Sequence, residues 1–165
     1  MLNERQMNFY DSLNYYDRCV ALSKKYHKEE DGLEKTDKTQ VINLIEALDY
    51  KAKYKRKENF YQILDEKNDI KFYFHFSLKY GLVEVIFGTL RETDNNGEKI
   101  GDEIGGLIGN VCGLIKYTES NDIEIYKQTR IKKPVFQNYD ELKIILQDYL
   151  SFYEDFKIEF VKQYS

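Results

Sequence analysis

The amino-acid sequence predicts an α+β fold: an antiparallel β-sheet of about four or five strands, with N-terminal helices and a long C-terminal helix packed on one face. The middle of the chain alternates apolar and polar residues from Ile70 to Lys79, which is the period of a half-buried strand. Both ends instead place apolar residues three and four apart, which is the period of a helix. Short turns between the strands favour an antiparallel sheet over a parallel one.

The first 30 residues predict one helix, whose apolar stripe comprises Phe9, Leu13, Tyr16 and Val20. Gly32 is expected to end this helix, and a polar connector follows it. A second helix is expected to begin after Asp37, because Gln40 lies at the spacing of a capping box. Its apolar positions run to Leu48, and it is expected to fray within the segment KAKYKRKE, near residues 51–58.

The strands are predicted from alternation and from turn residues. Residues 59–67, 70–79 and 82–92 read as a meander, with a tight turn at Tyr80–Gly81. The segment Asp94–Gly97 is the clearest turn of the chain. A later strand is predicted over residues 123–131, since Ile123 and Ile125 alternate with polar neighbours.

The glycine-rich segment from Gly101 to Gly113 fits two structures. As a helix it would carry five glycines, each costing about 1 kcal/mol relative to alanine, so a strand preceded by a loop is favoured. The final helix is better defined, because Asn138 caps it with Glu141 three residues later. Its apolar stripe comprises Leu142, Ile145, Leu146, Tyr149, Phe152, Tyr153, Phe156 and Phe160.

Length and composition suggest one domain, residues 1–165, of ordinary globular composition. No apolar run approaches the roughly 18 residues of a membrane span and no signal core precedes the fold, so a cytoplasmic protein without a membrane partner is expected. Cys19 and Cys112 are expected to be reduced thiols. The net charge of −4 predicts that nucleic acid is not a partner.

Motifs for catalysis or cofactors do not emerge from the sequence. The glycines do not match a phosphate-binding loop. Asp94, Asn96 and Glu98 resemble a calcium loop, but its sixth and twelfth positions hold Lys99 and Gly105. Two histidines and two cysteines, none adjacent, do not form a zinc motif. No metal, no cofactor and no enzymatic activity are therefore expected.

Charge is distributed unevenly along the chain. Between Glu92 and Glu124 there are eight acidic and two basic side chains, which leaves six net negative charges. Basic residues gather instead in Lys51–Lys57 and in Arg130–Lys133. The separation is typical of a solvated surface with local ion pairs, or of an acidic surface that captures a basic partner.

The sequence resembles immunity proteins of bacterial polymorphic and contact-dependent toxin systems. The resemblance lies in the tail KKPVFQNYDELKIILQDYLSFYEDF, where a proline leads into a capped amphipathic helix, and in the Gly105–Gly106 step after an acidic loop. It covers roughly residues 80–160 and involves general features of such families.

The resemblance implies an inhibitor that binds a cognate toxin domain and occludes its active site. Many such toxins are nucleases with basic clefts, so an acidic surface would mimic phosphate. The expected contacts are Glu92, Asp94, Glu98, Asp102 and Glu103. Two alternatives stay open: a non-catalytic adaptor that binds another protein, and a small enzyme working through His75, Tyr73 and nearby acids.

Overall fold

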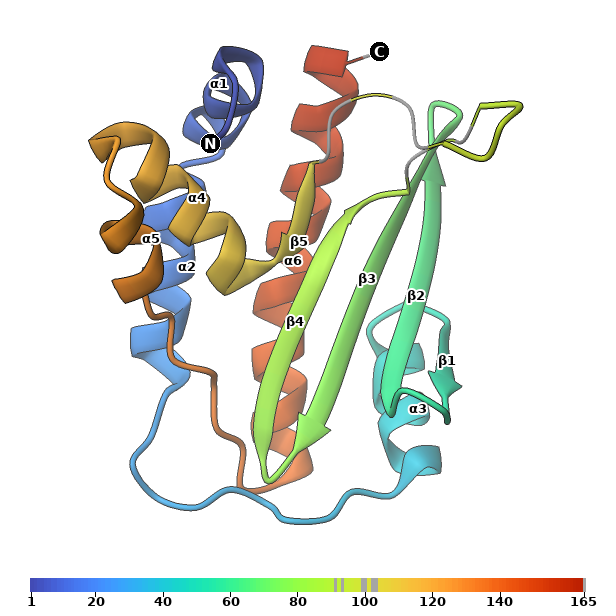
Figure 1. Ribbon diagram of the computed structural model, residues 1–165. Coiled ribbons are helices and arrows are strands. Elements are labelled where there is room, and N and C mark those ends of the chain that lie inside the picture. The colour runs from blue at the N-terminus through green and yellow to red at the C-terminus, as the bar shows by residue number, and fades with distance from the viewer. Residues whose placement is uncertain (91, 93, 99–100, 102–103, 165) are drawn as a thin grey trace.

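The fold is built on an antiparallel β-meander, in which the strands follow one another across the sheet in chain order (Figure 1). The structure, a computed structural model, describes residues 1–90, 92, 94–98, 101 and 104–164. All neighbouring strands are antiparallel. The strands are β1 (Ala52–Lys55), β2 (Phe60–Lys67), β3 (Ile70–Lys79), β4 (Leu82–Thr89) and β5 (Gly105–Leu107).

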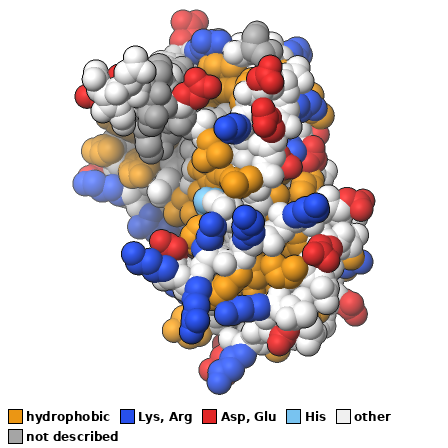
Figure 2. All heavy atoms as spheres, turned by 90° about the vertical axis from the view of Figure 1, so that its right-hand side faces the viewer, with side chains coloured by type: hydrophobic (Ala, Val, Ile, Leu, Met, Phe, Trp, Pro, Cys, Tyr) orange, Lys and Arg blue, Asp and Glu red, His pale blue; other side chains and the backbone are white. Residues whose placement is uncertain are grey.

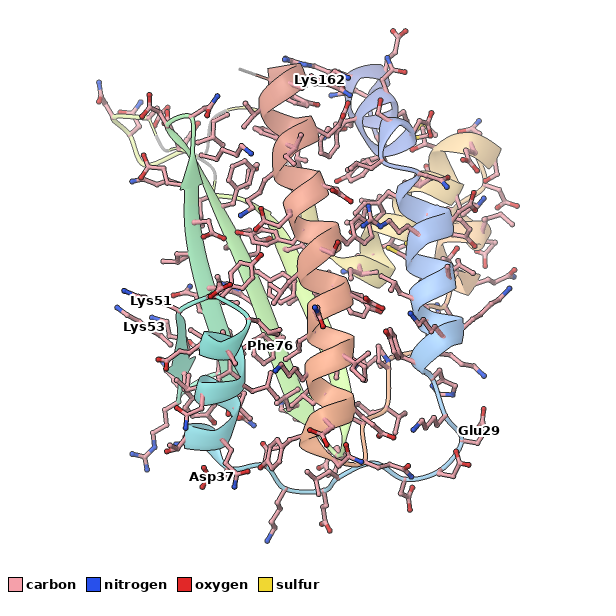
Figure 3. The ribbon with its side chains drawn as sticks, turned by 180° about the vertical axis from the view of Figure 1, so that it is seen from behind. Glu29, Asp37, Lys51, Lys53, Phe76 and Lys162 are labelled. Atoms are coloured by element: carbon pink, nitrogen blue, oxygen red, sulfur yellow. The ribbon has the colours of Figure 1, made fainter. Side chains whose placement is uncertain are left out.

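Helices cover one face of this sheet. They are α1 (Glu4–Ser12), α2 (Tyr15–Tyr26), α3 (Lys38–Ala47), α4 (Ile108–Ser120), α5 (Ile123–Gln128) and α6 (Tyr139–Tyr164). The long helix α6 runs behind the sheet and contacts β3 and β4, while α3 lies beside it against β1 (Figures 1 and 3). α1 packs on α6, and α2 on α4. The predicted α+β class, with its antiparallel sheet and long C-terminal helix, is confirmed.

Aromatic side chains fill the space between the sheet and α6. The alternation predicted for β3 is confirmed, since Phe72, Phe74 and Phe76 are all buried on this face. Phe87 of β4 lies at the centre of the layer. Its ring centroid is 5.3 Å from that of Phe152 and 5.2 Å from that of Phe156, both edge-to-face contacts.

The N-terminal segment forms two helices where the sequence predicted one. Asn14 adopts a left-handed conformation with φ of 51°, which separates α1 from α2. The break rotates the buried side, so that α2 buries Tyr15 and Cys19 and leaves Tyr16 and Val20 only partly covered.

Gly32 does not end a helix, because α2 already ends at Tyr26. Gly32 lies instead where two backbones cross, and a Cβ atom on it would lie 2.7 Å from the Cα of Gly81 in the β3–β4 turn. The Leu33 N–H donates to the Phe136 carbonyl at 2.8 Å, and the Phe136 N–H donates to the Gly81 carbonyl at 3.0 Å. Three distant segments are thereby joined at one end of the sheet.

Asp37 caps α3 as predicted, since its carboxylate accepts a hydrogen bond from the Gln40 N–H at 3.0 Å. The second bond of a capping box is replaced, because the Asp37 N–H donates to the Tyr139 hydroxyl at 2.8 Å. The helix ends at Ala47, however, and the segment predicted as its frayed end contains the outer strand β1. Tyr54 explains the strand: it packs on the core with its ring centroid 5.0 Å from that of Tyr61, while lysines occupy the alternate positions.

The glycine-rich segment contains a short strand and then a helix. The predicted strand is confirmed over Gly105–Leu107 and is wrong from Ile108 onward, where α4 begins. The strand predicted over residues 123–131 is also wrong, because the segment contains α5. Asp122 caps this short helix by accepting a hydrogen bond from the Glu124 N–H at 2.9 Å.

Replacing each of two glycines within α4 by alanine is expected to have opposite effects on stability. A Cβ atom on Gly109 would meet nothing within 4 Å, so Gly109→Ala should raise the free energy of unfolding by about 0.5 kcal/mol through helix propensity alone. A Cβ atom on Gly113 would lie 2.8 Å from the Tyr126 ring, so Gly113→Ala should cost about 1 kcal/mol. Urea unfolding measures both changes, and a gain in both variants would contradict the close packing at Gly113.

The final helix agrees with the prediction. The Glu141 N–H donates to the Asn138 side chain at 2.9 Å, which caps the N-terminus of α6. The predicted apolar stripe is buried along the sheet, except that Phe160 is only partly buried.

The two cysteines, distant in sequence, are both fully buried in the core. Burial, and then a hydrogen bond with Cys112, raise the pKa of the Cys19 thiol. Both thiols are free, and neither is exposed to solvent.

Candidate functional site

The loop after β4 carries the predicted partner-binding residues. Glu92, Asp94 and Glu98 are exposed, as are the intervening residues 95–97. Asp102 and Glu103 lie outside the described residues. The Leu90 N–H donates to the Lys71 carbonyl at 2.9 Å, so the loop leaves the sheet beside the β2–β3 turn. The loop therefore projects from the end of the sheet opposite the β3–β4 turn (Figure 1).

Hydrogen bonds centred on Asp94 shape this loop. Its carboxylate oxygen Oδ1 accepts from the N–H groups of Asn96 at 2.8 Å and Glu98 at 2.9 Å. The Asp94 N–H donates to the Glu98 carbonyl at 2.8 Å, and the Gly97 N–H to the Asp94 carbonyl at 3.0 Å. The turn predicted at Asp94–Gly97 is confirmed. Asp94, which was predicted as a partner contact, also stabilises the shape of the turn.

The neighbouring β2–β3 hairpin brings two further acids to this end, together with Lys67 and Lys71. Glu66 and Asp69, from the end of β2 and the β2–β3 turn, are exposed beside the loop. We call this group the acidic end: it comprises Glu66, Asp69, Glu92, Asp94 and Glu98.

The remaining acids of the predicted stretch lie elsewhere. Glu119 and Glu124 belong to α4 and α5, on the far side of the molecule from the loop (Figure 1). Each is paired within its own helix, to Lys116 and Lys127 respectively, at 3.2 Å. The charge counted along the sequence is thus divided between two separate surfaces.

Two of the three basic side chains in the second basic segment, Arg130–Lys133, pair with acids. Lys133 pairs with Glu84 of β4 at 2.6 Å, and Lys132 lies 3.7 Å from the Glu29 carboxylate. Arg130 donates to the backbone carbonyls of Lys127 and Thr129. These contacts attach the segment before α6 to its surroundings.

The sheet face opposite α6 is covered by no described helix (Figures 1 and 3). Of the residues on this face, the sequence singled out only Tyr73 and His75 as a candidate site, that of the enzyme alternative. The strand register places one row of side chains across all five strands. The row comprises Lys53, Gln62, His75, Ile86 and Leu107. We call this surface the open face. The sequence of β4 indicates this surface, because both faces of the strand carry apolar residues. Leu82 and Ile86 lie on the open face, opposite the buried Val83, Val85 and Phe87.

Aromatic rings gather around His75 at the centre of the open face. The His75 ring centroid is 4.6 Å from that of Phe60 and 4.7 Å from that of Tyr73. The Tyr73 hydroxyl leans across β4 above Gly88, where a Cβ atom would lie 3.3 Å from it. Because Gly88 has no side chain, the Tyr73 ring can lie along the sheet.

The protonation of His75 follows from this setting. Partial burial, and then the positive charge of Lys55, lower the pKa of the imidazole below its ordinary value of 6.5. The ring is therefore neutral at pH 7, and its Nε2 atom lies 3.1 Å from the Gln62 amide nitrogen. A lowered pKa also means that unfolding takes up a proton, so this group favours the folded state less as pH falls below about 6.5.

A hollow of about 190 Å³ opens beside His75, and its lining includes Phe60, Ser77 and Ile86. Such a hollow is the feature that the enzyme alternative requires. Two carboxylates, those of Glu58 and Glu84, also line the hollow. Glu84 pairs with Lys133 at 2.6 Å, and the hydrogen-bond partner of His75 is the Gln62 amide.

Elsewhere, one charged group is buried beneath the sheet. Lys157 of α6 is 6% exposed and pairs with Glu154 at 2.7 Å and with Asp65 of β2 at 3.2 Å. The Tyr50 hydroxyl donates to the same Glu154 carboxylate at 2.6 Å. The buried charge is compensated by neighbours, which identifies it as part of the framework.

Metal-binding groups and membrane-spanning helices are absent from the part of the chain that the structure describes. Among residues 1–90, 92, 94–98, 101 and 104–164, no three His, Cys, Asp or Glu side chains are grouped so as to hold a metal ion. Within those residues, none of the helices combines the length and apolar character that crossing a membrane requires. Comparison with protein-family models, curated proteins and solved structures finds no match to this chain.

Proposed function

We infer that this chain is an immunity-type inhibitor: a cytoplasmic protein that binds a cognate bacterial toxin domain and covers its active site without doing chemistry itself. The observation that carries the proposal is the acidic loop, whose turn is closed by its own hydrogen bonds and holds exposed carboxylates at one end of the sheet. A surface that is already ordered loses less entropy on binding.

The chemistry of the acidic end fits a basic partner. Glu92 and Glu98 make no ion pair with any described residue. An acidic projection attracts a basic cleft over a distance of about 10 Å at ordinary salt, and it raises the association rate as well as the specificity. A nuclease toxin, which binds phosphates through such a cleft, is the partner class that matches this surface best.

Charge reversal tests the loop. The triple variant Glu92→Lys, Asp94→Asn, Glu98→Lys reverses the charge of these three positions from −3 to +2. The amide introduced at position 94 keeps the oxygen that accepts the two turn hydrogen bonds. We expect toxin-domain affinity to fall at least about tenfold, mainly through a slower association rate. The partner is isolated by affinity capture from native lysate, purified, and titrated by calorimetry.

A second variant controls for net charge. Glu34→Lys with Glu46→Lys changes exposed acids far from the loop and should leave the affinity unchanged. Unchanged affinity in the triple variant would reject the loop as the contact site. Co-expression provides the functional readout: an immunity protein protects cells from the captured domain, whereas capture of housekeeping proteins alone, with no protection, would favour the adaptor.

A further inference from the structure

The open face differs from the acidic end in both charge and chemistry. Figure 2 views the molecule from the side of β1, and there lysine and arginine side chains gather over the lower half around a hydrophobic patch. By register, Lys53 lies beside Gln62 and Lys55 beside Phe60, while Lys79 ends β3 at the same side of the sheet. None of these three lysines forms an ion pair with a residue that the structure describes.

Few acidic side chains lie near this face. Glu84 is bound by Lys133 at 2.6 Å, and Glu66 lies opposite Lys71 in the β2–β3 register. Glu58 is the remaining acid that lines the hollow. It is outweighed by Arg56 and Lys57, which precede it in the β1–β2 connection, so the lower half of the open face carries net positive charge.

The rings add a second, independent feature. Phe60, His75 and Tyr73 form a contiguous series in which each neighbouring pair is tilted by 43°. A nucleobase presents a flat π surface about the size of such a ring, and stacking contributes about 1–3 kcal/mol per base. The Gln62–His75 pair between the rings offers polar atoms to base edges.

We propose that the open face binds single-stranded nucleic acid, with bases stacked on Phe60, His75 and Tyr73 and phosphates held by Lys53, Lys55 and Lys79. A single strand fits better than a duplex, whose bases hide their faces against each other. An acidic polypeptide would satisfy the lysines but has no flat group for each ring. The net charge of −4 predicted no nucleic-acid partner because it averages this face with the acidic end.

The test uses the full-length protein and a fluorescein-labelled oligothymidylate of about twelve nucleotides. Fluorescence anisotropy at about 50 mM salt should give a saturable curve with a Kd in the micromolar range, and binding should weaken as salt increases. The same oligonucleotide in a duplex should bind at least about tenfold more weakly, because its bases cannot stack on the rings.

Variants separate stacking from charge. Phe60→Leu and Tyr73→Leu keep apolar volume but remove the ring, and each should raise the Kd about tenfold. Lys53→Gln with Lys55→Gln should reduce the slope of log K against log salt by about 1.4, or about 0.7 per lost phosphate contact. Lys143→Gln with Lys162→Gln, on exposed positions of α6 behind the sheet, is the matched control and should change neither (Figure 3).

Three results would overturn the proposal, provided that thermal melts show folded variants. They are no saturable binding at about 50 mM salt, equal binding of duplex with no effect of the leucine variants, and preferential binding of a polyglutamate peptide. The acidic-loop triple variant should bind the oligonucleotide at least as tightly as the parent. The toxin proposal and this one can therefore fail independently.

Discussion

Gly81→Ala is expected to lower the free energy of unfolding by about 3 kcal/mol, which is a large effect for a substitution that removes no side-chain atoms. Gly81 has φ of +71°, where an alanine costs about 1–2 kcal/mol. A Cβ atom would also lie 2.4 Å from the Cα of Gly32 and 2.6 Å from the Leu33 nitrogen, both backbone atoms that cannot rotate away. The chain crossing would have to separate.

Urea unfolding at equilibrium measures this change, with the m-value checking that the unfolding transition is otherwise the same. Gly97→Ala is the matched control, because Gly97 has a similar φ of +82° but nothing within 4 Å of the added atom. It should cost only about 1 kcal/mol. Equal losses at the two positions would show that the crossing of Gly32 and Gly81 contributes nothing beyond the backbone conformation.

Phe87→Ala is expected to lower the free energy of unfolding by about 3–5 kcal/mol. The side chain is fully buried, and its ring contacts those of Phe152 and Phe156 from α6. Removing it leaves a cavity between the sheet and the long helix, and the rigid neighbouring rings limit how far the site can collapse.

Ile86→Ala is the control for this variant, since Ile86 is the next residue of β4 and points to the opposite face. It should cost less than about 1.5 kcal/mol, because its side chain is only partly covered. Thermal and urea unfolding of the two variants decide the matter. An equal cost would mean that the open face is packed as tightly as the core and is not a surface awaiting a partner.

The parts of the fold that could be predicted are those with local signals. The β3–β4 hairpin follows from strict alternation around Tyr80–Gly81, and α6 from a cap and a long stripe. The break at Asn14 was not predicted, because the apolar spacing from Phe9 to Val20 continues through it, although asparagine adopts the left-handed conformation more readily than most residues. β1 was hidden by its composition: Ala52 and Tyr54 alternate with lysines, but so many charges resemble the solvated end of a helix.

The candidate sites divide in the same way. An exposed acidic turn at Asp94 could be predicted from its residues alone, since the turn chemistry is local. The open face could not, because it assembles Phe60, Tyr73 and His75 from two strands through their register. The separation of charge between the two surfaces could likewise not be predicted from the net charge, because the net charge contains no information on where charged residues lie.

The two border strands of the sheet also affect whether copies of this protein aggregate by adding strands to one another. On the outer side of β1, lysines alternate along the strand, and like charges repel any second strand that would add there. At the other border, β5 pairs with only part of β4. The segment before α6 pairs with the start of β4, through the Leu82–Val135 bridge and a hydrogen bond from the Val83 N–H to the Pro134 carbonyl. Both features oppose growth of the sheet into fibrillar aggregates.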